Sequence, residues 1–481
     1  MSDTGIHGFG AYIPRTRLQR SAIHAANGWF AGGLRGLAKG EKAVGNWDED
    51  PITMAVEAAR DLFADRPRSI DGITLASTTH VFADRQNAGV IKEALDLADA
   101  TGALDAGGSQ RCGTSSLIAA FDAAAAGKTT LHLASERSIP APASEREMMA
   151  GDAAAAILTG PGAGIARLVG SHSVTADFVD HFRENGEDNN YDWEARWVRD
   201  EGFGKIMVPA IRAALAKFGV DGQSISRFIV PILIRGVPEM LAKAAGISAD
   251  AVTDELGAKV GNSGAAHPTL MLAHALEAAA PGDLLLLVSF GQGCDIMLFE
   301  TTPDIASVKP RLGVSGWLER RAESANYMKY LAHRDLIRLE RGPRAEHDSK
   351  TALTALWRNR KAVMALVGGR CTKTGTIQFP MSEVSVNPND HAIRTQEEYP
   401  LADISATIMT YTADALAFSP DPPDCYGNIE FEGGGRMMAQ FTDIAADALE
   451  VGVPLRMMFR IKNFDELRGF RRYFWKAAPA F

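Results

Sequence analysis

Short β-like runs alternate with alanine-rich amphipathic segments through the first 300 residues of the chain. The run at 71–78 (DGITLAST) precedes QNAGVIKEALDLA at 86–98, and LMLAHALEAAA at 270–280 precedes DLLLLVSF at 283–290. Strands and helices that alternate in this way are typical of a sheet whose faces are covered by helices. The pattern therefore predicts an α/β layered fold for this part of the chain.

Two glycine-led segments suggest that this layered region consists of two similar halves. Residues 151–160 (GDAAAAILTG) and 291–300 (GQGCDIMLFE) each place glycine just ahead of an apolar strand. We therefore expect one half at 1–165 and a second at 166–303.

The composition changes at about residue 303. The segment TTPDIASVKPRLG at 301–313 supplies turn residues, and charged segments with apolar residues three and four apart follow it. These features predict a helical linker over 304–366. Short β runs separated by Gly, Pro and Asp dominate the last part of the chain, which predicts a small antiparallel β-barrel within 367–481.

Charge and hydropathy argue against several classes of protein. The 481-residue chain has a formal net charge of -9 and no clustered Lys and Arg, so we expect no nucleic-acid partner. The longest apolar run, LLLLV at 284–288, is far shorter than the roughly 20 residues of a membrane helix. The four cysteines have no framework spacing and the N-terminal residues do not resemble a signal peptide, so we expect a cytoplasmic protein.

Cys112 stands at the start of a predicted helix, directly after the turn-like residues at 109–111. The helix is indicated by an apolar stripe that includes Leu117 and Phe121, and Gly127 ends it. The first turn of a helix carries partial positive charge, which favours a thiolate, the form of cysteine that attacks carbonyl carbons. The alternative is that Cys112 is simply a small buried residue.

Over most of residues 1–300 the sequence resembles the thiolase superfamily, nearest the ketoacyl synthase III and HMG-CoA synthase branch. The resemblance rests on five segments in the same order: GIHGFGAYIPRTRL at 5–18, SQRCGTSSLIAAFDAAAAG at 109–127, GDAAAAILTG at 151–160, VGNSGAAHPTLMLAHALE at 260–277 and LLLLVSFGQGCDIMLFE at 284–300. It implies a thiolase-like layered fold, a homodimer, and acylation of Cys112 by a thioester. The implied substrates are a coenzyme A thioester and a β-keto or acyl acceptor.

At two positions the chain differs from the relatives that it resembles. Ile232 in RFIVPILIRG stands where they carry a histidine, and Thr78 stands where HMG-CoA synthases keep a carboxylate. Acyl transfer needs a group that moves protons and donors for a developing oxyanion. A specialised Claisen or retro-Claisen reaction is therefore favoured over the decarboxylative ketoacyl synthase and HMG-CoA synthase reactions.

Three polar residues remain as candidates for the missing roles. Asn262 matches an asparagine whose amide donates to an acyl oxygen in the resembled synthases, although a turn or helix-cap asparagine would look the same. His267, before Pro268 at a helix start, resembles a thiolase-branch histidine and could replace the lost one; the alternative is a capping or solvated residue. His80 is the last residue of the predicted strand DGITLASTTH at 71–80. It lies on the side of the sheet where such folds place their sites.

A glycine loop is the candidate for the oxyanion hole. Gly291 and Gly293 resemble the closing glycine loop of the family, in which backbone N–H groups bind the acyl oxygen. Cys294 beside them is expected to be a packing residue.

Residues 367–481 resemble an acyl-CoA-associated OB-fold family that is often encoded beside, or bound to, thiolase-like enzymes. Members commonly carry a zinc knuckle with two CxxC pairs, but here Cys371 stands alone and Thr374 takes the second ligand position. One thiolate cannot hold a structural zinc, so we predict no metal. The expected role of this module is to pack on the thiolase-like domain and shape a tunnel for the substrate.

Two hypotheses follow from the sequence. In the first, the chain is an acyltransferase that forms an acyl-S-Cys112 intermediate from an acyl-CoA or β-ketoacyl substrate and makes or thiolytically cleaves a carbon-carbon bond. In the second, it is a catalytically impaired thiolase-like scaffold or binding subunit. A narrower variant of the first is an aldolase-type relative in which a residue other than Cys112 is the base.

Overall fold

The computed structural model describes residues 3–64, 66–342 and 352–480. Their contacts divide the chain into two compact units. The first contains Met1–Asn46, Asp50–Gly89 and Ala98–Leu336, and the second contains Trp47–Glu49, Val90–Leu97 and Ile337–Phe481. The division falls inside the segment 304–366, whose first part thus belongs to the first unit.

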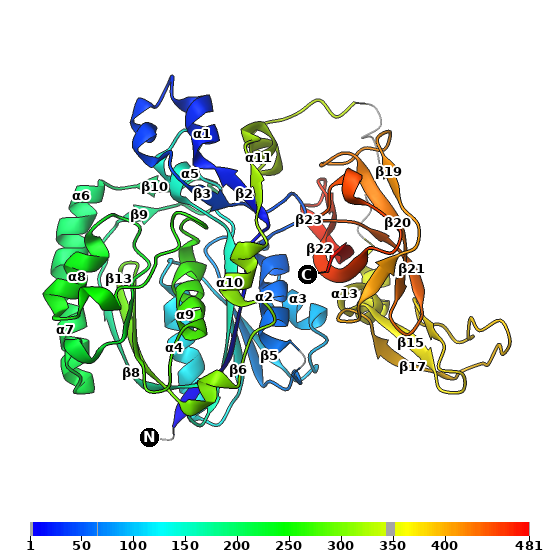
Figure 1. Cartoon of the computed structure of the whole chain (residues 1–481), viewed down its shortest axis with the longest axis horizontal. Helices are drawn as coiled ribbons and strands as arrows, with labels where there is room; N and C mark the ends of the chain where they lie inside the picture. The colour runs from blue at the N-terminus through cyan, green and yellow to red at the C-terminus, as the bar shows by residue number, and fades with distance from the viewer. Residues whose placement is uncertain (1–2, 65, 343–351, 481) are drawn as a thin grey trace. The chain divides into compact units, whose positions relative to one another are not determined.

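A nine-stranded mixed sheet organises the first unit (Figure 1). Its order is β11-β12-β13-β8-β1-β7-β6-β4-β5. The strands are β1 (Thr4–Tyr12), β4 (Gly72–Ala76), β5 (Gly102–Ala106), β6 (Thr130–Glu136), β7 (Ala153–Pro161), β8 (Ala166–Thr175), β11 (Arg227–Ile229), β12 (Leu284–Phe290) and β13 (Gly293–Thr301). The strand β4 pairs in parallel with both β5 and β6, so the carboxyl ends of these three strands lie at one edge of the sheet.

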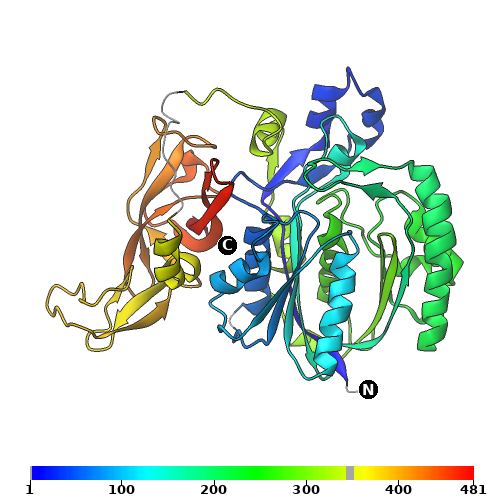
Figure 2. The same ribbon diagram turned by 180° about the vertical axis from the view of Figure 1, so that it is seen from behind.

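Helices pack on this sheet, which confirms the predicted α/β layered fold. The helices that pack most extensively on its strands are α2 (Pro51–Phe63), α4 (Cys112–Ala125), α7 (Val208–Phe218), α9 (His267–Glu277) and α10 (Gly313–Glu319). The unit also contains α1 (Arg20–Asn27), α5 (Glu145–Met149), α6 (Ala195–Trp197), α8 (Val237–Ala245) and α11 (Tyr327–His333), whereas most of α3 (Asn87–Ala94) belongs to the second unit. The helix α4 packs on β6 and β7 and against α9, and both helices lie centrally in the unit (Figures 1 and 2).

Local sequence explains where two of these helices begin. The helix α2 starts with a capping box, in which the Asp50 side chain accepts from the Thr53 N–H and the Thr53 hydroxyl oxygen accepts from the Asp50 N–H. Pro51 occupies the first turn. All thirteen residues of α2 are buried. The helix α4 begins at Cys112, as the sequence predicts.

Smaller elements lie at the margin of the first unit. The strands β2 (Thr16–Gln19), β3 (Glu41–Ala43) and β14 (Ala322–Ser324) form a small sheet, and β9 (His181–Phe182) pairs with β10 (Tyr191–Asp192). Short helices at Gly264–Ala266 (η5) and Val198–Met207 (η2) complete the elements used below. Within the described ranges, no helix is long and apolar enough to cross a membrane.

The second unit is an antiparallel β-barrel, as the sequence predicts. Its strands are β15 (Val367–Cys371), β16 (Ile377–Gln378), β17 (Gln396–Pro400), β18 (Ala406–Ile408), β19 (Thr412–Asp414), β20 (Asp424–Phe431), β21 (Arg436–Gln440), β22 (Pro454–Asp465) and β23 (Phe470–Pro479), preceded by helices α12 (Leu353–Arg358) and α13 (Arg360–Ala365). The long hairpin β22–β23 is antiparallel throughout, and its buried residues include Phe459 and Trp475.

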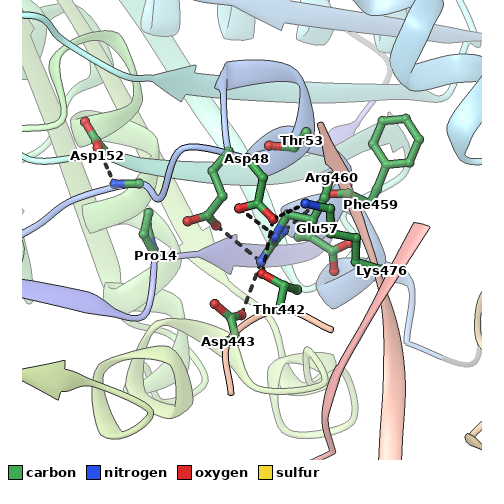
Figure 3. A network of polar contacts seen from close by, with 12 residues as sticks. Pro14, Asp48, Thr53, Glu57, Asp152, Thr442, Asp443, Phe459, Arg460 and Lys476 are labelled. Atoms are coloured by element: carbon green, nitrogen blue, oxygen red, sulfur yellow. Dashed lines mark hydrogen bonds and ion pairs between the residues drawn. The ribbon is translucent and has the colours of Figure 1, made fainter. Parts of the chain in front are cut away.

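A buried charged network stabilises the second unit (Figure 3). Lys476 Nζ lies 2.9 Å from Asp48 Oδ2, and Thr442 Oγ1 donates to the same oxygen over 3.2 Å. Arg460, which is fully buried, pairs with Glu49 at 3.3 Å and with Asp443 at 3.2 Å. Burial alone would raise the pKa of Asp48, but Lys476 and Arg460 hold it below its usual range.

Candidate functional site

The first turn of α4 is anchored by a buried carboxylate. Asp295 at the start of β13 is 1% exposed and accepts hydrogen bonds from three hydroxyl groups. They belong to Thr114 at 3.0 Å, Ser115 at 2.6 Å and Ser173 at 2.7 Å, and Arg111 lies 3.6 Å away. A carboxylate near a helix N-terminus is also favoured by the helix dipole. These contacts fix the turn on which Cys112 stands.

Small side chains surround the Cys112 sulfur. The residue is 6% exposed and clusters with four alanines: Ala76 on β4, Ala134 on β6, and Ala265 and Ala266 in η5. A Cβ at Gly113, the next residue, would lie 2.1 Å from the Ala265 carbonyl oxygen, so only glycine permits this close approach of α4 and η5. The sulfur therefore lies where elements from both halves of the sheet meet.

Burial of the Cys112 sulfur opposes the ionisation that a helix terminus favours. Burial, followed by the charge of Glu136, raises the pKa of the Cys112 thiol to about 12, and hydrogen bonds with the backbone of Ser77 and Gly113 act in the opposite direction. The loss of hydration thus outweighs the partial charge of the helix terminus. The raised pKa favours the thiol form at this position.

Glu136, which no sequence motif indicated, is close enough to this thiol for its charge to act on it. It is the last residue of β6, is 1% exposed, and its carboxylate accepts from the Thr78 N–H at 3.1 Å and the Thr78 hydroxyl at 3.0 Å. The Ala265 N–H lies 3.4 Å from the same group. Burial raises the pKa of Glu136, and the hydrogen bonds oppose that shift.

Thr78 and Ile232, the two positions of departure from the relatives, have different surroundings. Thr78 has no carboxylate of its own but holds that of Glu136. Ile232 is 7% exposed and belongs to an apolar cluster of the second half, with Phe228 and Leu241 among its members. The carboxyl group beside Thr78 is therefore that of Glu136, at the end of the neighbouring strand β6.

Asn262 lies in a loop that pairs with the segment before β7. Its backbone N–H donates to Met149 O and its carbonyl accepts from Gly151, which fixes the loop. The side-chain Oδ1 accepts from the Gly264 N–H at 2.9 Å. This contact is the one expected of a turn asparagine. It orients the side-chain amide through its oxygen and does not use the amide N–H groups.

His267 is a buried residue whose two ring nitrogens both have partners. Nδ1 lies 3.1 Å from the Ser263 hydroxyl, and Nε2 donates to the Glu255 carbonyl over 2.9 Å. Burial lowers the pKa of His267 to about 4, so the ring is neutral. In this structure the imidazole holds the loop that carries Asn262, and neither ring nitrogen is left for a substrate.

His80 has one ring nitrogen without a partner. Nε2 lies 3.0 Å from the Ala106 carbonyl oxygen, and because a carbonyl only accepts, Nε2 carries the proton in this bond. Nδ1 is buried and has no hydrogen-bond partner among the described residues. Ala106 itself packs on the cluster around Cys112, so the His80 ring lies in the same region.

The glycine loop closes on itself. The Gly291 N–H, one of the expected oxyanion-hole donors, donates to the Gly293 carbonyl at 2.9 Å. The loop also lies against Arg111, since a Cβ at Gly291 would meet the Arg111 backbone nitrogen at 3.0 Å. The loop is therefore next to the start of α4, but the N–H of Gly291 is engaged within it. Cys294, which follows, is fully buried among apolar residues of β12 and β13.

The charged segment 176–197 reaches this region from outside. Arg183 donates to the Thr78 carbonyl, and Arg146 forms a two-point ion pair with Asp192. Large aromatic side chains of the segment are exposed: Phe182, Tyr191, Trp193 and Trp197. The segment is thus anchored beside Thr78 while its aromatic side chains face solvent.

The barrel contains the isolated cysteine of the expected degenerate knuckle. Cys371 Sγ lies 3.1 Å from Thr395 Oγ1, so its neighbour is a hydroxyl. Across residues 3–64, 66–342 and 352–480, no group of three or more His, Cys, Asp or Glu side chains is arranged to hold a metal ion.

Comparisons with known proteins agree with this architecture. Residues 215–298 match the C-terminal domain of 3-oxoacyl-[acyl-carrier-protein] synthase III, and residues 398–460 match the C-terminal OB-fold domain of ChsH2. Hydroxymethylglutaryl-CoA synthase of Aeropyrum pernix is 30% identical over 332 residues, which cover 67% of this chain and 92% of the relative. The chain belongs to the hydroxymethylglutaryl-CoA synthase branch of the thiolase superfamily. The corresponding enzyme of Archaeoglobus fulgidus is 27% identical over 343 residues.

Solved structures show the same fold in the layered part of this thiolase-like chain. MvaS in complex with 3-hydroxy-3-methylglutaryl coenzyme A has a TM-score of 0.59 at 20% identity and covers 73% of this chain and 94% of its own. The 3-oxoacyl-(acyl carrier protein) synthase III of Pseudomonas aeruginosa has a TM-score of 0.56 at 18% identity and covers 63% and 98%. The predicted thiolase-like fold with a C-terminal OB-fold domain is confirmed.

Proposed function

We propose that this chain is a CoA-dependent acyltransferase that forms an acyl-S-Cys112 intermediate and makes or thiolytically cleaves a carbon-carbon bond. The kind of enzyme is supported by its relatives, which are condensing synthases. The observation that carries the proposal is the position of Cys112. It is the first residue of a helix held by Asp295, and it faces η5 of the second half and the ends of β4 and β6.

The acyl oxygen and the carbon acceptor need polar partners near this sulfur. We assign the side-chain amide of Asn262 to the acyl oxygen, because its Oδ1 is held by Gly264 and its N–H groups remain for a ligand. The Nδ1 of His80 is buried and without a hydrogen-bond partner among the described residues, so we assign it a polar contact with the second substrate. His267 is a positioning residue that holds the Asn262 loop.

A coenzyme A thioester is the substrate class that we favour. Solved structures with this fold include MvaS in complex with 3-hydroxy-3-methylglutaryl coenzyme A and an HMG-CoA synthase complexed with CoA. In the acylation step, the Cys112 sulfur forms a bond to the thioester carbonyl carbon, the bond to the CoA sulfur breaks, and the thiol proton leaves with CoA. No oxidation or reduction occurs.

Intact-protein mass spectrometry tests the proposal. Incubation with short-chain, β-keto and aromatic acyl-CoAs is expected to add one acyl mass, and Cys112→Ala is expected to abolish the adduct. Cys294→Ala is a matched control, because burial also raises the pKa of the Cys294 thiol to about 12 and Cys294 packs in a different apolar cluster from Cys112. An adduct that persists in Cys112→Ala, or is lost in Cys294→Ala alone, would contradict the assignment.

A scaffold without chemistry is the second candidate. The observation in its favour is the resting state of Cys112, a buried thiol surrounded by alanine side chains. This candidate predicts that the wild-type chain gains no mass from any of these thioesters while still binding them or a partner protein.

We also propose that the enzyme is a homodimer. The strand β5 ends the nine-stranded sheet, and its only partner among the described strands is β4. Leu104 in the middle of β5 is 56% exposed, and an open edge strand is a natural surface for pairing with a second copy. Light scattering is expected to give a dimer, and Leu104→Arg to shift it toward monomer; a monomeric wild type would contradict the proposal.

A further inference from the structure

The proposed acylation has an unassigned proton. Burial raises the pKa of the Cys112 thiol to about 12, so the thiol form is strongly favoured near neutral pH. A thiol attacks a thioester poorly unless a base removes its proton as the bond forms. The site therefore needs a proton acceptor close to the sulfur.

Glu136 has the position and the partners for that task. Ala265 lies against both groups, because its N–H is 3.4 Å from the Glu136 carboxylate and its side chain packs in the cluster around Cys112. The charge of Glu136 also acts on the Cys112 thiol. The Asn262 loop approaches the carboxyl closely: a Cβ at Gly264, which has a φ of +52°, would lie 2.9 Å from Glu136 Cγ. No described Lys or Arg forms an ion pair with Glu136, so its charge is not already neutralised by a cation.

The charged and titratable groups around Glu136 leave Cys112 as its partner. Arg183 donates to the Thr78 carbonyl, and Arg137, the next residue, donates to the His333 carbonyl. His80 binds the Ala106 carbonyl. The contacts that Glu136 does receive come from neutral groups, the hydroxyls of Thr78 and Thr79 and the N–H groups of Thr78 and Ala265.

We propose that Glu136 is the proton-transfer residue of this site. Its carboxylate takes the proton of the Cys112 thiol while the sulfur attacks the thioester carbonyl, and it returns that proton to the departing CoA sulfur. In the second half of the reaction it takes a proton from the carbon acceptor and gives it to the Cys112 sulfur as the acyl group leaves. Each step balances without an added oxidant or reductant. The inference rests on the acyltransferase function proposed above.

Thr78 acts through Glu136 as a positioning residue. Its N–H and hydroxyl hold the carboxylate and favour its charged form, the form that accepts a proton. Thr78→Val keeps the shape and removes the hydroxyl, so the pKa of Glu136 rises further. The pH at which acylation becomes efficient is therefore expected to move upward.

Two rates measured on Glu136→Gln separate catalysis from structure. Removal of the negative charge makes the thiol more acidic, so alkylation of Cys112 by iodoacetamide between pH 7 and 10 becomes faster. Removal of the proton acceptor slows acylation by acyl-CoA, by about 10²-fold or more. A residue that only supported the fold would change both rates in the same direction. Glu136→Asp is expected to recover part of the acylation rate.

Glu147→Gln is the matched control. Glu147 is fully buried, its pKa is likewise raised by burial, and its contacts are with Tyr327 and the backbone of Ala143 instead of Cys112. It is expected to leave both rates unchanged. Should Glu136→Gln fail to fold, Thr78→Val and Glu136→Asp provide the same pH-profile measurement.

The outcomes distinguish this inference from the proposed function. If wild type is acylated on Cys112 and Glu136→Gln is acylated equally fast with the same pH profile, Glu136 is not the proton-transfer residue. If wild type gains no acyl group from any thioester while its thiol still alkylates, the acyltransferase function itself fails.

Discussion

The anchor of α4 gives a prediction whose size follows from the structure. Asp295→Asn replaces a buried carboxylate that accepts three hydroxyl hydrogen bonds and lies 3.6 Å from Arg111. The amide keeps one acceptor oxygen but turns an N–H₂ group toward hydroxyls and a cation. Hydrogen bonds to a charged group contribute about 1.5–3 kcal/mol each, and part of this is retained, so we expect a loss of about 3 kcal/mol.

Urea unfolding followed by tryptophan fluorescence measures this loss. Asp122→Asn is the control, because Asp122 lies on the exposed side of the same helix and has little to lose. The variant is also expected to slow acylation of Cys112, since the turn that carries the sulfur is no longer fixed. A change below about 0.5 kcal/mol, the size of an ordinary surface substitution, would show that the three hydroxyl contacts do not hold α4.

Three further changes test other parts of the structure. The pKa of Glu136 is raised in the folded state, so the fold loses stability as pH rises from the ordinary value near 4.5 through the folded value. Glu136→Gln is therefore expected to raise the urea midpoint at pH 8 while the acylation rate falls. An unchanged midpoint would contradict the predicted direction of this stability change. The pKa of Asp48 is lowered in the folded state, so the stability that Asp48 contributes is present above pH 3.8 and is lost as pH falls through the folded value. Lys476→Met is therefore expected to destabilise the barrel at pH 7 and to make its unfolding, followed by circular dichroism, less sensitive to acid. Gly113→Ala places a Cβ 2.1 Å from the Ala265 carbonyl, and a cost of about 1–3 kcal/mol with slower acylation is expected; wild-type thermal unfolding would refute the close approach.

Much of the fold could be predicted from local patterns. The alternation of β runs and amphipathic segments correctly indicated β4, α3, α9 and β12, because each is specified by its own hydrophobic periodicity. The start of α4 at Cys112 was likewise readable, since small polar residues precede it and an apolar stripe follows. The unit boundary was less readable, because α10 and α11 contribute to the first unit although their charged sequences resemble a linker.

The chemistry of the site could be predicted only in part. The thiolate expected from the helix terminus depends on how much water surrounds the sulfur, and burial is a property of the whole fold. Glu136 was missed because it ends an ordinary strand, 24 positions from Cys112 in the chain; only the parallel pairing of β6 with β4 brings it to Thr78. The available signal was a carboxylate at the carboxyl end of a buried strand beside the nucleophile's helix. His267 showed the opposite case, since its position in sequence fitted catalysis while its ring nitrogens bind Ser263 and Glu255.

A crystal structure after a brief soak with an acyl-CoA tests the central claim most directly. We expect continuous density from Cys112 Sγ into an acyl carbonyl, with the acyl oxygen toward the Asn262 amide and the Glu136 carboxyl beside the sulfur. An intact thioester beside a free Cys112 thiol, or an acyl group on another residue, would contradict it.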